Sequence, residues 1–139
     1  MAKPNWLEEL AENWFRMRDY VTQMHVPAPK IKTRRGPPRI LDLIAFNDKE
    51  FVMVELQTSV TKADAKRAIQ KFKDFNEIPN SALYRRVSSG KSLRRIFIGR
   101  ATDGAAADFA RSVEAHGIEF IEREDFYKQI IGLVKPQPI

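Results

Sequence analysis

The sequence predicts an α/β domain in which helices cover both faces of a mixed sheet. Three observations lead to this fold class. Stretches with helical periodicity alternate with short apolar runs, two of these runs flank a polar turn, and no repeat or low-complexity linker divides the chain. The length of 139 residues is close to that of one ordinary domain. We therefore expect residues 1–139 to form a single domain.

Residues 5–24 are predicted to form the first helix, because apolar side chains recur three or four positions apart. Asn5 suits the N-cap, and Glu8 stands three residues later, where a capping box places its acid. The apolar stripe expected to face the core consists of Leu7, Leu10, Trp14, Met17, Val21 and Met24. Glu8 and Glu12 lie at the polar margin of that stripe. A further strand fits residues 23–31.

The rest of the chain alternates between predicted strands and helices. Residues 40–46 and 51–57 are expected to form two strands around the turn 47–50. The remaining predicted elements are a helix over 61–75, a strand over 95–99, an alanine-rich helix from Thr102 to Gly117, a strand over 118–122 and a helix over 124–134. With the strand near 23–31, the order is α-β-β-β-α-β-α-β followed by a C-terminal helix.

Composition excludes several classes of function. The chain has no cysteine and only two histidines, which rules out disulfides, thiolate chemistry and a multi-histidine metal site. No apolar run approaches the roughly 18 residues that span a bilayer, and no signal peptide opens the chain. We therefore expect a cytoplasmic protein that does not associate with membranes.

Positive charge is concentrated in the middle of the chain, which has a formal net charge of +6 overall. Residues 20–102 hold 17 Lys and Arg against seven Asp and Glu, and the runs 30–39 and 80–102 contain no acid. Such runs indicate a nucleic acid partner, although a solvated basic surface is the alternative for either run alone. The residues expected to contact nucleic acid are Lys30, Lys32, Arg34, Arg35, Arg39, Lys62, Arg85, Arg86, Lys91, Arg94 and Arg95.

The hairpin 40–57 carries the strongest indication of chemistry. If its turn is centred on Asp48 and Lys49, Asp42 faces Glu55, and the face they share is apolar except for these two acids and Gln57 at one end. The opposite face is entirely apolar and consists of Leu41, Leu43, Ala45, Val52, Val54 and Leu56. Two carboxylates opposed across a sheet repel each other, and a divalent cation such as Mg²⁺ would resolve that conflict. The alternative is that both acids lie beyond the covered part of the sheet and are simply hydrated.

The hairpin resembles the PD-(D/E)XK nuclease superfamily. In that superfamily an acidic residue begins one strand, and an acid-x-lysine triplet follows on the next. Here the matching residues are Asp42 and the triplet Glu55-Leu-Gln57. The helix carrying Ala11-Glu12 is similar to the one that supplies another acidic ligand in archaeal Holliday junction resolvases. The resemblance implies a restriction-endonuclease-like core over about residues 6–122.

The resemblance also implies a site and an activity. Asp42, Glu55 and the Leu56 carbonyl would ligate Mg²⁺ or Mn²⁺, with Glu12 as a further ligand. Gln57, which replaces the usual lysine, would position the attacking water, and Lys62 could supply a displaced charge. The expected activity is metal-dependent hydrolysis of DNA, branched or otherwise structured, by a homodimer. A catalytically inactive nucleic-acid-binding protein and a subunit of a larger assembly remain the alternatives.

Overall fold

The computed structural model describes residues 6–29, 36–61, 63–101 and 106–134. Its helices are α1 (Trp6–Met17), α2 (Asp64–Phe75), α3 (Arg85–Ser88), α4 (Ala106–Glu114) and α5 (Arg123–Val134). Its strands are β1 (Val21–Pro27), β2 (Ile40–Phe46), β3 (Glu50–Val60), β4 (Ser92–Ala101) and β5 (Ile118–Glu122). Within these ranges, no helix is long and apolar enough to cross a bilayer.

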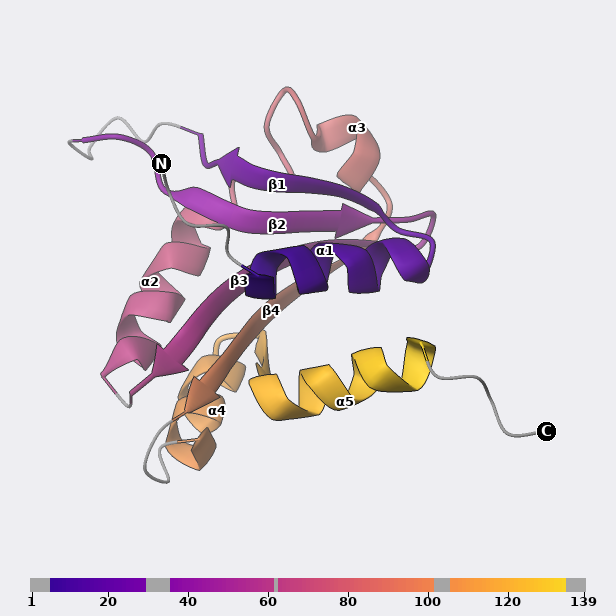
Figure 1. Ribbon diagram of the computed structural model, residues 1–139. Helices are drawn as coiled ribbons and strands as arrows, with labels where there is room; N and C mark the ends of the chain where they lie inside the picture. Colours follow the sequence, from indigo (N-terminus) through magenta and orange to yellow (C-terminus); the bar gives the residue numbers. More distant parts are fainter. Residues whose placement is uncertain (1–5, 30–35, 62, 102–105, 135–139) are drawn as a thin grey trace.

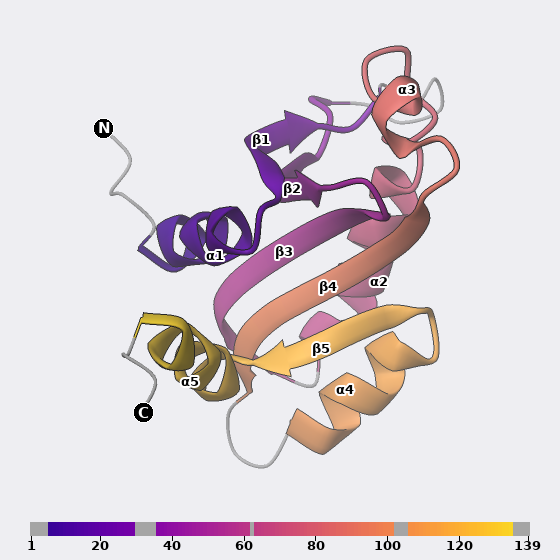
Figure 2. The same ribbon diagram turned by 90° about the vertical axis from the view of Figure 1, so that its right-hand side faces the viewer.

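The five strands form one mixed sheet in the order β1-β2-β3-β4-β5. Strand β2 runs antiparallel to β1 and to β3, and β4 runs parallel to β3 (Figure 1). Strand β5 runs parallel to β4. Helices α1 and α5 cover one face of this sheet, and α2 and α4 cover the other (Figure 2). The observed order of elements confirms the predicted α/β class.

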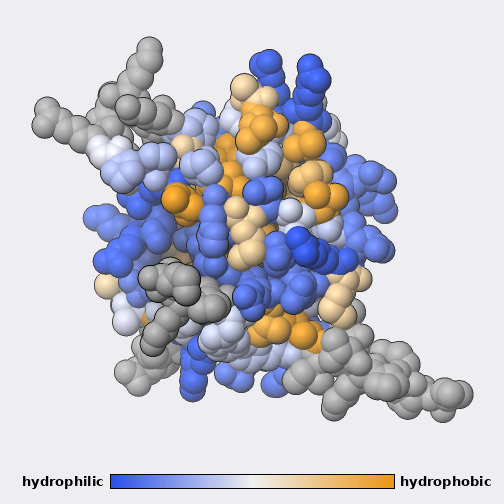
Figure 3. All heavy atoms as spheres, turned by 45° about the horizontal axis from the view of Figure 1, so that its top comes forward, coloured by the Kyte–Doolittle hydropathy of each residue, from blue (hydrophilic) through white to orange (hydrophobic). Residues whose placement is uncertain are grey.

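Two apolar clusters fill the space between the sheet and its helices. The cluster under α1 and α5 takes Leu43, Ala45, Val52, Val54 and Leu56 from the hairpin. The cluster under α2 and α4 takes Ile44, Phe51 and Met53 from the opposite face. This alternation is the one that the sequence predicts. On the outside, the face seen in Figure 3 is mainly hydrophilic, with apolar atoms in separate groups.

The first helix is shorter than predicted. It ends at Met17, and Asp19 then adopts a left-handed conformation with φ of 65°. The chain continues as β1, an edge strand in which Val21 is 58% exposed. Its side chains alternate between exposed and at least partly buried, so the strand predicted near 23–31 exists and begins earlier. The predicted helical stripe is therefore wrong beyond Trp14, and Phe15 completes the buried face of α1.

Smaller differences concern the ends of other elements. Helix α2 begins at Asp64 rather than at Thr61, and the Asp64 carboxylate accepts a hydrogen bond from the Thr61 N–H at 2.7 Å. Strand β4 runs over Ser92–Ala101, longer than the predicted 95–99. The basic segment before it includes the short helix α3. The expected start of the next helix at Thr102 lies outside the described residues.

Candidate active site at the open end of the hairpin

Asp42 and Glu55 lie where β2 and β3 separate. Phe46 pairs with Phe51 and Ile44 with Met53, as the predicted turn requires, and the pairing ends at Leu43 and Val54. Beyond that point, side-chain carboxylates accept the hydrogen bonds that link the two strands, in place of backbone carbonyl groups. The Asp42 N–H donates to Glu55 Oε1 at 3.1 Å, and the Leu56 N–H donates to Asp42 Oδ2 at 2.9 Å. The two acids are therefore held side by side by reciprocal bonds to the opposite strand.

At this point the side chains of β1 and β2 switch from one face of the sheet to the other. His25 is opposite Asp42, and it adopts a left-handed conformation with φ of 54°. Met24 and Leu43 pack with the cluster under α1, whereas Val26 and Leu41 belong to the cluster under α2. The prediction that Leu41 shares a face with Leu43 is therefore wrong. The regular alternation breaks at His25 and Asp42, and this break turns the chain at the site.

Both carboxyl groups are buried enough to disfavour their charged forms. Glu55 is 5% exposed, and it is the buried acid of the described core. Burial, together with the charge of the adjacent Asp42 carboxylate, raises the pKa of Glu55 to about 8, although Lys71 opposes the shift. Burial also raises the pKa of Asp42, which the Leu56 N–H partly offsets. Two neighbouring carboxyls with raised pKa values are typical of a site prepared for a cation.

A lysine from α2 provides the positive charge nearest to this pair. Lys71 Nζ lies 3.5 Å from Glu55 Oε2, and its side chain is about one-third exposed. The sequence alone does not point to Lys71. Its one local signal is that Lys71 directly precedes Phe72, an apolar position of α2, whereas the packing of α2 over the sheet face that carries Glu55 is known only from the structure.

Helix α1 contributes Glu8 to the site. The Glu8 carboxyl reaches Asp42, where its charge and a side-chain hydrogen bond raise the Asp42 pKa. His25 Nε2 lies 2.8 Å from Glu8 Oε2 and connects β1 to the same cluster. Glu12, one turn later, instead accepts a hydrogen bond from Thr22 at 3.3 Å and pairs with Arg16. Glu8 thus occupies the place beside Asp42 that we expected of Glu12.

Gln57 and Leu56 have different relations to the acidic pair. The Gln57 amide donates to the Ser59 carbonyl at 2.8 Å and lies 3.5 Å from Asp64, beyond the end of the acidic cluster. The backbone N–H of Leu56 contacts Asp42, and Leu56 pairs with Ile98 of β4. Lys62, expected to supply a displaced charge, lies outside the described residues.

The donor set fits a hard divalent cation bound through two carboxylates. In the described ranges, no group of three or more His, Asp and Glu side chains could hold a metal ion. Mg²⁺ does not need such a cage, because proteins hold it through one or two carboxylates, with water and substrate phosphates completing the coordination. A cation between Asp42 and Glu55 would also remove the electrostatic cost of ionising two buried neighbouring acids.

The basic residues predicted to bind nucleic acid fall into three groups. Lys30, Lys32, Arg34 and Arg35 lie outside the described residues, as does Lys62. Arg39, Arg94 and Arg95 bond within the protein: Arg39 to Asp74 at 2.7 Å, Arg94 to Glu50 and Glu119, and Arg95 to Asn76. Arg85, Arg86 and Lys91 line a cavity of about 610 Å³ beside α3.

Arg94 and Arg95 do not serve one surface. They are consecutive in β4, so their side chains point to opposite faces of the sheet. The two ion pairs of Arg94 raise its pKa, whereas burial lowers that of Arg95. A nucleic acid lying on one face of the sheet would therefore meet only one of these two side chains.

Comparison with known proteins identifies the fold. No protein-family model and no curated protein matches the sequence. A solved structure of a protein of unknown function, AF1548, matches with a TM-score of 0.56 at 13% identity, over 85% of this chain and 58% of that one. The small subunit of the heterodimeric restriction endonuclease R.BspD6I matches with a TM-score of 0.58 at 14% identity, over 94% and 69% of the two chains.

A repair endonuclease from Pyrococcus abyssi also matches, with a TM-score of 0.45 at 18% identity, over 88% of this chain and 48% of that one. This chain spans little more than half the length of the AF1548 structure. The mixed sheet, its helical layers and the match to the restriction endonuclease subunit together define a restriction-endonuclease-like α/β fold. The predicted fold class is confirmed.

Proposed function

We propose that the chain is a metal-dependent endonuclease of the PD-(D/E)XK type that hydrolyses phosphodiester bonds in DNA. The observation that carries the proposal is the buried Asp42–Glu55 pair at the open end of the hairpin, with Lys71 beside it. The fold it shares with a restriction endonuclease subunit supports the same activity.

In this proposal Asp42 and Glu55 hold Mg²⁺ or Mn²⁺, with the Leu56 carbonyl as a further ligand and an acid of α1 nearby. When bound, the cation would polarise a phosphoryl oxygen and lower the pKa of a coordinated water. Lys71 lies beside Glu55, where a positive charge can stabilise negative charge developing on the phosphate. Gln57 has no charge, but its amide can hydrogen-bond a water at the edge of the site.

The proposed substrate is branched or otherwise structured DNA, and the proposed assembly is a homodimer. Both expectations follow from the resemblance to archaeal Holliday junction resolvases, because a dimer places two sites on two strands.

An apolar groove between α1 and α5, lined by Trp6, Leu10, Tyr127 and Ile130, supports the dimer. Trp6 is 50% exposed there. Light scattering should give twice the chain mass, and Trp6→Glu should give a monomer.

Cleavage of labelled DNA tests the activity. Four-way junctions, nicked and continuous duplexes, and single strands would be incubated with Mg²⁺ or Mn²⁺, beside Asp42→Asn and Glu55→Gln. Glu114→Gln, an exposed change on α4, is the matched control. We expect cleavage that requires metal, is lost in both site variants and is retained in the control. Binding without cleavage, unchanged in both site variants, would instead support the inactive nucleic-acid-binding protein.

A further inference from the structure

A cavity separate from the carboxylate pair lies between the end of α2, the helix α3 and the start of β3 and β4. Its volume is about 610 Å³, and Arg85, Arg86 and Lys91 contribute positive charge to its walls. No acidic residue lines it in the part of the chain that the structure describes, and no carboxylate there pairs with Arg85 or Arg86. The cavity therefore has a net positive potential suited to an anion.

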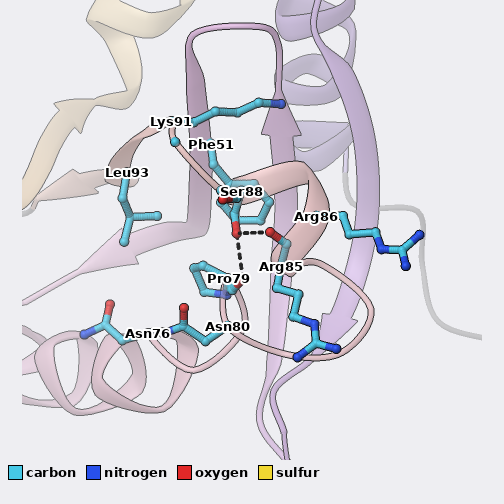
Figure 4. A pocket seen from close by; sticks show the side chains of 11 residues that line it. Phe51, Asn76, Pro79, Asn80, Arg85, Arg86, Ser88, Lys91 and Leu93 are labelled. Carbon is cyan, nitrogen blue, oxygen red and sulfur yellow. Dashed lines mark hydrogen bonds between the residues drawn. The ribbon is translucent and has the colours of Figure 1, made fainter.

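The cavity also has groups that recognise more than charge. Leu93, which is 37% exposed, and Pro79 contribute apolar surface. Asn76 and Asn80 line the same space, and Arg95 already bonds the side-chain carbonyl oxygen of Asn76. The NH₂ group of Asn76 and the amide of Asn80 can bond the edge of a nucleobase. Figure 4 shows these two amides on one side, with Arg85 extending from α3 near them and Arg86 pointing the other way. An apolar wall, amides and a cation around one cavity match the base and phosphate of a nucleotide.

The position of the cavity relates it to the proposed active site. Phe51, at one end of β3, lines the cavity, and Glu55 lies four residues further along the same strand. At the rise of a β-strand, this separation is about 13 Å. On B-form DNA the same distance corresponds to about four base pairs. A strand cut at Asp42 and Glu55 could therefore reach the cavity a few nucleotides away.

We infer that this cavity binds one unpaired nucleotide of the DNA strand, with its phosphate on Arg85 and its base against Leu93 and the two asparagine amides. The inference rests on the proposed function for DNA as the ligand and for the distance between the cut and the cavity. A continuous duplex presents its bases stacked and paired, so it can offer this cavity only phosphates. A flap, a tail or a branch offers the base as well, and the cavity would favour such substrates.

The test compares binding of a blunt duplex with that of the same duplex carrying a short unpaired tail. Fluorescence anisotropy in EDTA measures binding without cleavage. The wild type should bind the tailed duplex about tenfold more tightly, the size of one base contact. Arg85→Ala/Arg86→Ala should abolish this preference, and Leu93→Ala should reduce it without changing the salt dependence. Arg111→Ala/Lys128→Ala removes two exposed charges elsewhere and should leave the preference intact.

Other outcomes would overturn the inference. Equal weakening of blunt and tailed binding in the Arg85→Ala/Arg86→Ala variant would mean that the cavity contributes only electrostatic attraction to DNA and does not recognise an unpaired nucleotide. Thymidine monophosphate that binds without competing with the tailed duplex would make the ligand a free nucleotide rather than a strand. The anisotropy measurement repeated with Asp42→Asn separates the nucleotide site from the proposed nuclease, because it reports the tail preference in a chain whose carboxylate pair is altered. A preserved tail preference with no cleavage by the wild type would reject the nuclease and retain the nucleotide site.

Discussion

The backbone N–H of Asp42 donates a hydrogen bond to the carboxylate of Glu55 at 3.1 Å, at the point where β2 and β3 part. The reverse contact runs from the Leu56 N–H to the Asp42 carboxylate at 2.9 Å. These bonds satisfy backbone groups that the ladder no longer pairs, and they hold two acids together in a poorly solvated place. The same arrangement that completes the hairpin thus stores electrostatic repulsion that a cation would relieve.

The first prediction concerns pH and stability. The folded-state pKa of Glu55, about 8, lies above its ordinary value of 4.5, so folding favours the neutral acid. The contribution of Glu55 to stability is therefore fully present below about pH 4.5 and is lost as the pH rises through 8. We expect the metal-free wild type to lose stability relative to Glu55→Gln over this range, by at most about 1.4 kcal/mol per pH unit.

Thermal unfolding in EDTA at pH 5, 7 and 8.5 measures this difference directly, because other titrating groups are common to both proteins. Added Mg²⁺ should raise the melting temperature of the wild type at pH 8.5 and leave that of Glu55→Gln unchanged. Parallel curves for the two proteins across the range would contradict the raised pKa.

The second prediction concerns Lys71. Its removal leaves Glu55 beside Asp42 without the nearby cation that lowers the Glu55 pKa. In the proposed mechanism it also removes a positive charge that would stabilise the reacting phosphate. We expect Lys71→Ala to reduce the cleavage rate by about 100- to 1,000-fold. Lys71→Arg should restore part of it. Lys66→Ala, an exposed change on the same helix, serves as the control. Equal rates for Lys71→Ala and Lys66→Ala would remove Lys71 from the site.

The hairpin could be predicted because its determinants are local. The turn at Asp48 and Lys49 and the alternation of apolar residues set its register, and so place Asp42 near Glu55. Lys71 and Glu8 could not be placed in the same way, because their positions depend on how α2 and α1 dock on the sheet. Both lie at the margin of a buried helical stripe, where small rotations decide which side chain reaches a strand.

At the end of the first helix, by contrast, the local pattern of apolar residues gave a wrong prediction. Val21 and Met24 continue the helical spacing of apolar residues, yet they belong to β1. The left-handed conformation of Asp19 ends the helix, and the β-branched Val21 and Thr22 suit an edge strand that pairs with β2. The spacing of apolar residues along one segment cannot indicate this pairing, because the partner strand β2 begins only at Ile40, farther along the chain.

The third prediction separates the two acids of α1. Glu8 reaches Asp42 and contacts His25, whereas Glu12 bonds Thr22 and Arg16. If an acid of α1 contributes to metal binding, we expect Glu8→Gln to weaken Mn²⁺ binding by about 10- to 100-fold. Glu12→Gln should stay within about twofold of the wild type. Isothermal titration calorimetry measures both, and a larger effect of Glu12→Gln would reinstate the original expectation.

The fourth prediction concerns Gly99, which lies in β4 beside the proposed site. A Cβ atom there would be 2.8 Å from the Gln57 carbonyl oxygen and 3.2 Å from the Phe97 ring. Because the nearest atom belongs to the backbone of β3, the two central strands must move apart to accept it. We expect Gly99→Ala to lower the free energy of unfolding by about 1–3 kcal/mol.

Urea unfolding measures this loss, with Ser92→Ala at the exposed start of the same strand as the control. The displacement would also reach Glu55, two residues before Gln57 on β3. Gly99→Ala should therefore weaken Mg²⁺ binding even at temperatures where the variant remains folded, whereas Ser92→Ala should not. An unfolding midpoint equal to that of the wild type would show that β3 and β4 can separate at this point without cost, which the contact with the Gln57 carbonyl argues against.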